Sequence, residues 1–243
     1  MNDSEPKIYE SDAFLLGMRT IVIPDVHSSL HWKSILKYRK KERVIFLGDY
    51  FDNQGNGPFA ANAAQNFLEI CEYARDNSDT HLLVGNHDYD RIFHPSSYRY
   101  ANQKQEISAI LKNMDILDMI FVDENAEKPC IFSHGGLCAT FMRLNEIASV
   151  EEINTTWYER PMLFDFVWYG PNGLSSARDG DDPWQPPTWA RLTALQSDGI
   201  SGYNQVVGHT PIPGNTGPTI FPTVNGDIFL ATCTHDNTLI HLD

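Results

Sequence analysis

The feature that most constrains the fold is a succession of short apolar runs, each of which ends in a cluster of Gly, Asp, Asn or His. Runs of about four to eight β-prone apolar residues bounded by turn residues are typical of buried strands. We therefore predict five strands, at residues 20–24, 44–47, 81–84, 130–132 and 205–207. Each of them leads directly into side chains that can bind a metal ion or transfer a proton.

Helical patterns separate the first three of these strands. Residues 29–39 and 60–75 place apolar side chains at spacings close to one face of a helix. Alternating strands and helices predict parallel strands, and in open α/β sheets the functional site lies at the carboxyl ends of such strands. We therefore expect the five polar clusters to converge on one site.

The pattern changes after Pro211, where three further strands are predicted at residues 219–224, 228–232 and 238–242. Asn225-Gly226, between the first two, is a strong hairpin signal, so we expect these strands to add antiparallel pairs to a second sheet. Residues 171–189 are rich in Pro, Gly and Asp and predict a long loop that borders the substrate cleft.

The bulk composition argues against several classes of protein. A formal net charge of −14 disfavours broad binding to nucleic acids or anionic membranes, both of which need a cationic surface. No stretch approaches the roughly 18 apolar residues of a membrane helix, and the first residues lack a signal-peptide pattern, so a cytoplasmic location is expected. Four widely spaced cysteines predict reduced, buried thiols: Cys71, Cys130, Cys138 and Cys233.

Six polar residues at the predicted strand ends supply carboxylate, imidazole and amide groups without a thiolate. They are Asp25, His27, Asp49, Asn86, His134 and His209. This mixture suits Mn²⁺, Fe or Zn²⁺ better than Ca²⁺ or Mg²⁺, which prefer shells of oxygen alone. Six ligands exceed one tetrahedral site and fit two ions that share a bridging carboxylate, about 3.5–4 Å apart.

Most motifs around these residues are weak signals when taken alone, because Asp-x-His and Gly-Asp also occur as ordinary caps and turns, and only Gly85-Asn86-His87-Asp88 is moderately specific. Their joint occurrence in this order is specific. The ordered set is Asp25-x-His27, Gly48-Asp49-x-x-Asp52, Gly85-Asn86-His87-Asp88, Ser133-His134-Gly135-Gly136 and Gly208-His209-Thr210. It resembles the motif set of the calcineurin-like metallophosphoesterases, and among them most closely that of the lambda-type serine/threonine protein phosphatases of bacteriophage and bacteria.

The resemblance covers about residues 21–211, which is most of the chain. It implies an α/β fold in which a sandwich of two β-sheets is flanked by helices, a four-layer αββα arrangement. It also implies a single domain over residues 1–243, with two divalent metal ions at one edge. Mn²⁺ is the expected metal, with Fe or Zn²⁺ as alternatives.

The resemblance further assigns a role to each residue of the motifs. The ligands of the first ion are Asp25 and His27, those of the second are Asn86, His134 and His209, and Asp49 bridges the two ions. His87 is then the general acid that protonates the leaving oxygen, and Asp52 is its partner. A carboxylate that accepts a hydrogen bond from an imidazole fixes its tautomer and raises its pKa, which supports this pairing.

One position departs from the family pattern. The protein phosphatases usually continue the second motif with an arginine that binds phosphate, whereas Asn53 follows Asp52 here. Asparagine cannot form a charge-assisted bidentate contact with phosphate. Arg191 lies in a Trp-x-Arg run of the kind that the family places before the final histidine, so it is the first candidate for this contact. Arg91 is the second.

The leading hypothesis is a metal-dependent phosphatase that hydrolyses phosphate monoesters with a water activated by two metals. Its substrates would be phosphoproteins, as for a serine/threonine phosphatase, or small phosphate esters. Asn53 keeps a second hypothesis open, hydrolysis of nucleotides or phosphodiesters, as by dinucleoside polyphosphatases or cyclic-nucleotide phosphodiesterases. A third, a non-catalytic scaffold, is disfavoured because all six ligands, His87 and Asp52 are intact.

Overall fold

Two β-sheets form the centre of the computed structural model, which describes residues 8–11, 20–37, 42–52, 60–96, 103–125, 128–175, 180–211, 218–231 and 239–242. The first sheet has six strands, in the order β1 (Ile8–Ser11), β11 (Leu239–Leu242), β2 (Thr20–Ile23), β3 (Arg43–Phe46), β4 (Thr80–Leu83) and β5 (Leu117–Asp118). The second has five, in the order β6 (Ile120–Asp123), β7 (Cys130–Ser133), β8 (Asn204–Val207), β10 (Ile228–Leu230) and β9 (Thr219–Phe221).

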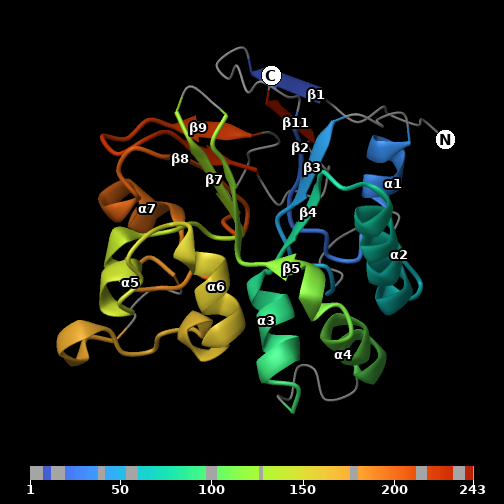
Figure 1. Cartoon of the computed structure of the whole chain (residues 1–243), viewed down its shortest axis with the longest axis horizontal. Helices are drawn as coiled ribbons and strands as arrows, with labels where there is room; N and C mark the ends of the chain where they lie inside the picture. The colour runs from blue at the N-terminus through green and yellow to red at the C-terminus, as the bar shows by residue number, and fades with distance from the viewer. Residues whose placement is uncertain are drawn as a thin grey trace.

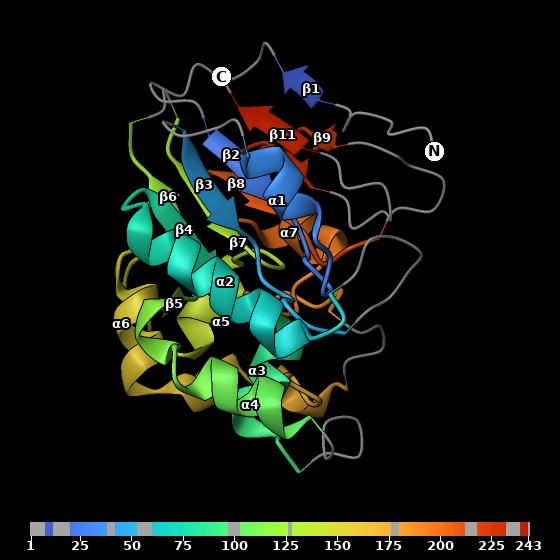
Figure 2. The ribbon, with the colours of Figure 1, turned by 90° about the vertical axis from the view of Figure 1, so that its right-hand side faces the viewer.

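Helices lie on the outer sides of both sheets. In chain order the α-helices are α1 (His31–Leu36), α2 (Ala63–Asp76), α3 (Asn86–Phe93), α4 (Lys104–Leu111), α5 (Ala139–Leu144), α6 (Glu152–Glu159) and α7 (Leu192–Asp198), with 3₁₀ turns at Met114–Ile116, Pro161–Phe164 and Pro171–Gly173. α1 and α2 lie beside the first sheet, and α5, α6 and α7 lie on the side of the second (Figures 1 and 2). The predicted fold class, α/β with two sheets flanked by helices, is confirmed.

Alternate side chains of the central strands enter two different cores. In β2, Ile21 and Ile23 pack in the core that includes α1 and α2. Val22, between them, packs with Phe132 of β7 and Val206 of β8 in a core between the two sheets. Successive residues of a strand point to opposite faces, so a strand buried on both faces must be apolar throughout. This explains why each central strand contains successive apolar residues, as in Ile21, Val22 and Ile23 of β2.

The five strands predicted from the apolar runs correspond to β2, β3, β4, β7 and β8, and the two predicted helices correspond to α1 and α2. β2, β3 and β4 are parallel neighbours in the first sheet. β7 and β8 are parallel neighbours in the second. The prediction of parallel strands is therefore confirmed for both sheets.

The carboxyl-terminal strands differ from the prediction in their partners. β9 and β10 pair antiparallel with each other in the second sheet, as expected, but β10 runs parallel to β8. β11 belongs to the first sheet, where it is antiparallel to β2 and parallel to β1. A turn signal governs only strands adjacent in sequence, whereas the partner of a later strand depends on which sheet edge is open for pairing.

Three simpler expectations concern the long loop, the cysteines and membrane helices. The described part of residues 171–189 contains the 3₁₀ turn at Pro171–Gly173 and no other helix or regular strand. Cys71, Cys130 and Cys138 are buried free thiols, and Cys233 lies outside the described residues. In the part of the chain that the structure describes, no helix has the length and apolar character needed to span a bilayer.

Candidate metal centre

The polar ends of the five central strands meet at one edge of the two sheets. Asp25 and His27 follow β2, Asp49 follows β3, Asn86 begins α3 after β4, His134 follows β7 and His209 follows β8. Main-chain hydrogen bonds join neighbouring loops. His27 N–H donates to the main-chain oxygen of Asp49 over 2.7 Å, and Gly208 N–H donates to the main-chain oxygen of His134 over 2.8 Å. The two sheets are joined at this edge by His209 N–H, which donates to Asp25 Oδ1 over 3.1 Å.

Asp25, His27 and Asp49 form a compact group in which one ligand atom of each lies within 4.8 Å of the others. His27 Nδ1 is 3.1 Å from the Phe51 main-chain oxygen, so a proton donated there leaves the Nε2 lone pair facing the two carboxylates. Burial opposes a charge on His27, yet its hydrogen bond to Asp25 and the charges of both carboxylates raise its pKa to about 9. The group therefore attracts positive charge, which a divalent ion can supply.

His134 and Asn86 form a second group on the other side of Asp49. His134 Nδ1 lies 3.0 Å from the Leu47 main-chain oxygen, and its Nε2 lies 2.9 Å from Asn86 Oδ1 and 3.5 Å from Asp49 Oδ2. When Nδ1–H donates to Leu47, the Nε2 lone pair and the Asn86 oxygen are two acceptors facing each other. A cation bound by both atoms would satisfy them.

His209 completes the second group. Its ring centroid is 4.9 Å from that of His134, and its buried Nε2 has no hydrogen-bond partner among the described residues. Burial, together with the electrostatic influence of the His134 ring and the Arg191 guanidinium, holds the pKa of His209 well below its usual value. A neutral imidazole with a buried, unsatisfied nitrogen fits a metal ligand, because metals bind the unprotonated form.

Asp49 lies between the two groups. Its Oδ2 atom is 4.0 Å from His27 Nε2 in the first group and 3.5 Å from His134 Nε2 in the second. The neighbouring groups are the Asp25 carboxylate, the His27 and His134 imidazoles and, beside His134, the Asn86 amide. The residues present therefore fit divalent metal ions, and a bridging role for Asp49 is consistent with its position.

The packing around the carboxylates is close and the backbone is strained. A Cβ atom at Gly85 would lie 2.2 Å from Asp49 Oδ1, and one at Gly208 would lie 2.4 Å from Asp25 Oδ1. Positive φ angles occur at five site residues other than glycine: His27, Ser28, Asp49, Asp52 and His209. Such conformations cost about 1–3 kcal/mol each and persist where the surrounding structure imposes them, commonly at functional sites.

His87 and Asp52 form a hydrogen-bonded pair beside Asp49, as predicted for an acid and its partner. His87 Nδ1 lies 2.5 Å from Asp52 Oδ2, and Nε2, on the opposite side of the ring, lies 3.9 Å from Asp49 Oδ2. Although burial opposes it, hydrogen bonds from His87 and Arg91 hold the pKa of Asp52 well below its usual value. Asp52 is therefore an anion that accepts the imidazole N–H and directs Nε2 toward the ligand groups.

Asp88 is a site residue to which the sequence analysis assigned no role. Its fully buried carboxylate accepts main-chain hydrogen bonds from Asp49 over 2.7 Å, Tyr50 over 3.0 Å and Gly85 over 2.9 Å. It thus joins the loop after β3 to the start of α3. Burial and the negative charge of Asp49 raise the pKa of Asp88 to about 7. Its place as the third residue of α3, where an acidic side chain caps the helix, was the available signal.

Two arginines were predicted to bind phosphate, and the structure places them differently. Arg191 immediately precedes α7, and its charge contributes to the lowered pKa of His209. Its predicted role in binding phosphate stays a prediction. Arg91 is fully buried, and its guanidinium donates to Asp52, Glu106 and other acceptors instead of facing solvent. These contacts do not support phosphate binding by Arg91. Asn53 lies outside the described residues.

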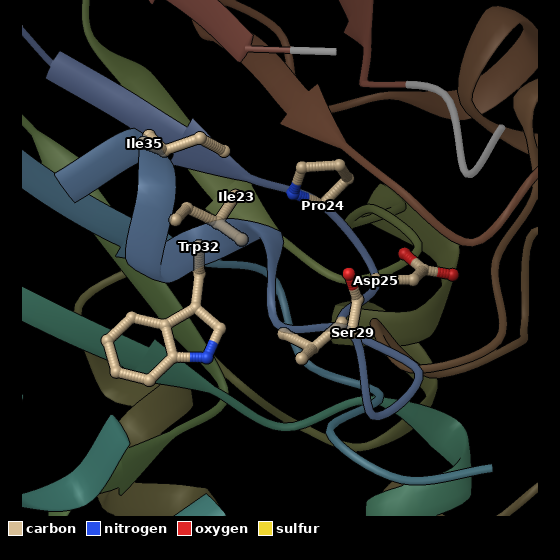
Figure 3. Close-up of a pocket in the computed structure, with 7 residues that line it drawn as sticks. Ile23, Pro24, Asp25, Ser29, Trp32 and Ile35 are labelled. Atoms are coloured by element: carbon tan, nitrogen blue, oxygen red, sulfur yellow. The ribbon is translucent and has the colours of Figure 1, made fainter. Parts of the chain in front are cut away.

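Two features border the ligand groups. The ring of Trp189 stands edge-on to His209, with centroids 5.5 Å apart, and forms a wall of the second group that the sequence analysis missed. A small pocket lies between the end of β2 and α1, and Figure 3 shows the Asp25 carboxylate turned away from the Trp32 indole that lines it. The rest of its lining is mostly apolar: Ile23, Pro24, Val26, Ser29 and Ile35. Of the described residues that line this pocket, Asp25 is the one that is charged, so they bring no further charged group to the metal centre.

The chain belongs to the calcineurin-like phosphoesterases, whose family model matches residues 18–215. This family acts on phosphate esters and generally depends on divalent metal ions, so the chain is a metallophosphoesterase. A comparison with curated proteins finds no match.

Solved structures with related folds include a protein serine/threonine phosphatase from Saccharomyces cerevisiae similar to human phosphatase PP5, at 14% identity and a TM-score of 0.49, over 94% of this chain and 72% of that one. A metallophosphoesterase from Sphaerobacter thermophilus is 16% identical with a TM-score of 0.43, over 90% and 77%. The Escherichia coli phosphoesterase Yfce is 14% identical with a TM-score of 0.36, over 88% and 78%. The narrower resemblance to lambda-type phosphatases stays a prediction.

Proposed function

We propose that this chain is a dinuclear metal-dependent phosphatase that hydrolyses phosphate monoesters, with phosphoserine and phosphothreonine proteins as its substrates. The observation that carries the proposal is the position of Asp49. Its carboxylate lies within 4.0 Å of imidazole nitrogens from both ligand groups and from His87. Ligand groups alone would support metal binding, whereas an acid placed beside them supports ester cleavage.

In this proposal Asp49 would be a ligand of both ions. Asp25 and His27 would hold the first ion, and Asn86, His134 and His209 would hold the second. When bound, two divalent ions, Mn²⁺ with Fe or Zn²⁺ as alternatives, supply positive charge that offsets the charge of the phosphate oxygens and activates water as the nucleophile. The chain holds the ligand atoms in place through its main-chain hydrogen bonds and through Asp88.

The general acid in this proposal is His87. Asp52 accepts the Nδ1–H of His87, which leaves Nε2 as the nitrogen that faces the ligand groups. The proton on Nε2 passes to the leaving oxygen as the bond from that oxygen to phosphorus breaks, so the product leaves as an alcohol. Serine and threonine alkoxides are strongly basic, so these esters depend on a proton donor more than aryl esters do.

Arg191 is proposed to bind the substrate phosphate. We expect Arg191→Ala to lower kcat/KM for phosphate monoesters by about 10- to 100-fold, because a charge-assisted contact to phosphate contributes roughly 1.5–3 kcal/mol. Arg191→Lys should recover only part of this loss, since lysine keeps the charge without the planar fork. Steady-state kinetics check the prediction, with Arg143→Ala, an exposed arginine on α5, as the control. Unchanged kcat/KM in Arg191→Ala would contradict the assignment.

The substrate class is tested with a panel of phosphoserine and phosphothreonine peptides, p-nitrophenyl phosphate, bis-p-nitrophenyl phosphate, a dinucleoside polyphosphate and a cyclic nucleotide. Each is assayed with Mn²⁺, Fe²⁺ or Zn²⁺ and with a chelator. We expect monoesters to be hydrolysed only when metal is added, and phosphopeptides to be turned over faster than nucleotides or diesters. Phosphopeptide turnover far below that of the other substrates would contradict the protein-phosphatase assignment.

The second candidate function is hydrolysis of nucleotides or phosphodiesters. Asn53 favours it, because the protein phosphatases usually have a phosphate-binding arginine at that position. The same metal ligands serve both candidates, so only the substrate differs. A single domain over residues 1–243 and a cytoplasmic location complete the proposal.

A further inference from the structure

We infer that Arg91 is a positioning residue, which holds Asp52 and thereby the imidazole of His87 in the orientation needed for proton donation. The inference rests on the proposed function, because it concerns how the acid of that reaction is oriented. The hydrogen bonds of the Arg91 guanidinium support the inference.

The Arg91 guanidinium forms a bidentate contact with both oxygens of the Asp52 carboxylate. Nη2 donates to Oδ1 over 2.7 Å, and Nη1 donates to Oδ2 over 3.2 Å. Asp52 Oδ2 is also the oxygen that accepts from His87 Nδ1. A two-point contact from a planar guanidinium fixes the plane of a carboxylate as well as its position. The direction of the His87 ring therefore depends on Arg91 through one shared oxygen.

Arg91 is itself held from several sides. Its Nε and Nη2 atoms donate to Glu106 Oε2 over 3.0 and 2.8 Å, and Nη2 also lies 2.9 Å from Gln103 Oε1. Nη1 donates to the main-chain oxygen of His87 over 3.0 Å, and the guanidinium lies 4.6 Å from the centre of the Phe51 ring. All three nitrogens of the buried guanidinium are thus engaged. This explains why Arg91 is suited to positioning and not to binding a substrate.

The helical spacing makes this arrangement possible. His87 and Arg91 are four residues apart on α3, so their side chains lie on the same face of the helix, one turn apart. Glu106 lies on α4, which packs against α3. Asp52 has a positive φ of 62°, a conformation that a non-glycine residue keeps only when its surroundings hold it. Arg91 supplies part of that support and links α4 to the acid.

The test is the dependence of the rate on the leaving group. We expect Arg91→Met to lower kcat for phenyl phosphate by about 100-fold, the scale of a misplaced catalytic group, and to lower kcat for 2,4-dinitrophenyl phosphate much less. Dinitrophenolate leaves without a proton, whereas phenolate needs one. Metal content should stay at the wild-type value. Arg91→Lys should restore part of the phenyl phosphate rate.

Arg43→Met is the matched control, because Arg43 is also a buried arginine that pairs with two carboxylates, Asp79 and Asp123. It begins β3, whereas the metal centre lies at the opposite end of that strand. The Arg43→Met variant should change the rates of both substrates by the same factor. An equal loss on both substrates in Arg91→Met, or no loss, would overturn the inference. If Arg91→Met does not fold, Arg91→Lys and Glu106→Gln decide by the same comparison.

This design separates the inference from the proposed function. A wild-type chain that hydrolyses neither aryl phosphate with Mn²⁺ contradicts the proposed function itself. A wild-type chain that hydrolyses both, with Arg91 variants that show no leaving-group dependence, contradicts the positioning role alone.

Discussion

Replacing His87 by alanine is expected to lower kcat for phosphate monoesters by about 10²- to 10⁴-fold, the usual contribution of a general acid, and to leave the metal content unchanged. The metal ligands should survive because His87 contacts Asp49 Oδ1 through its main-chain N–H, over 2.9 Å, and alanine keeps that group. The His87→Ala variant therefore lacks the imidazole and keeps the main-chain hydrogen bond to Asp49. Steady-state kinetics and elemental analysis of the purified variant measure the two quantities.

The control for this variant is His94→Ala. His94 follows α3 directly, its side chain is partly exposed, and it pairs with Asp165 outside the ligand groups. Its replacement should leave kcat unchanged. A His87→Ala chain with full turnover would show that another group protonates the leaving oxygen.

Replacing Asp49 by asparagine is the second large effect that we expect. The change keeps the shape of the side chain and removes the charge that both ligand groups share. Loss of an outer-shell partner alone costs about 10- to 100-fold in metal affinity, so loss of a shared ligand should cost more. We expect the variant to bind neither ion at concentrations that saturate the wild type, and to lose activity with them. Isothermal titration with Mn²⁺ measures the affinity.

Thermal unfolding distinguishes a lost ligand from a damaged fold in Asp49→Asn. The negative charge of Asp49 raises the pKa of Asp88, so the two carboxylates repel each other when no metal is bound. The metal-free variant should therefore be at least as stable as the metal-free wild type. Added Mn²⁺ should raise the Tm of the wild type and not that of Asp49→Asn. Asp115→Asn, at an exposed carboxylate, is the control, and a variant that still bound two ions would refute the bridging role.

The predictable part of the fold consists of the central strands and their polar ends. β2, β3 and β7, and the carboxyl-terminal halves of β4 and β8, are buried on both faces, so each contains an apolar run in the sequence. Parallel strands bring their carboxyl ends to one edge, which is why Asp25, Asp49 and His134 could be expected to meet. The family motifs added the order and the roles.

Other features were not predictable because they depend on contacts between distant segments. The placement of β11 in the first sheet depends on the open edge beside β2, which no local pattern records. The role of Arg91 depends on Glu106, which lies on the next helix and shows no spacing signal. Asp88 was visible as part of a motif, but its three main-chain hydrogen bonds appear only when the loop after β3 folds onto α3.

The most direct test of the central claim is a titration of the metal-free chain with Mn²⁺, in which bound ions and p-nitrophenyl phosphate hydrolysis are measured in the same samples. We predict that two ions bind per chain, that hydrolysis is absent in the chelator-treated protein, and that it rises as the second ion binds. Full hydrolysis in the presence of chelator, or saturation of activity with no ion bound at the Asp49 groups, would contradict the account.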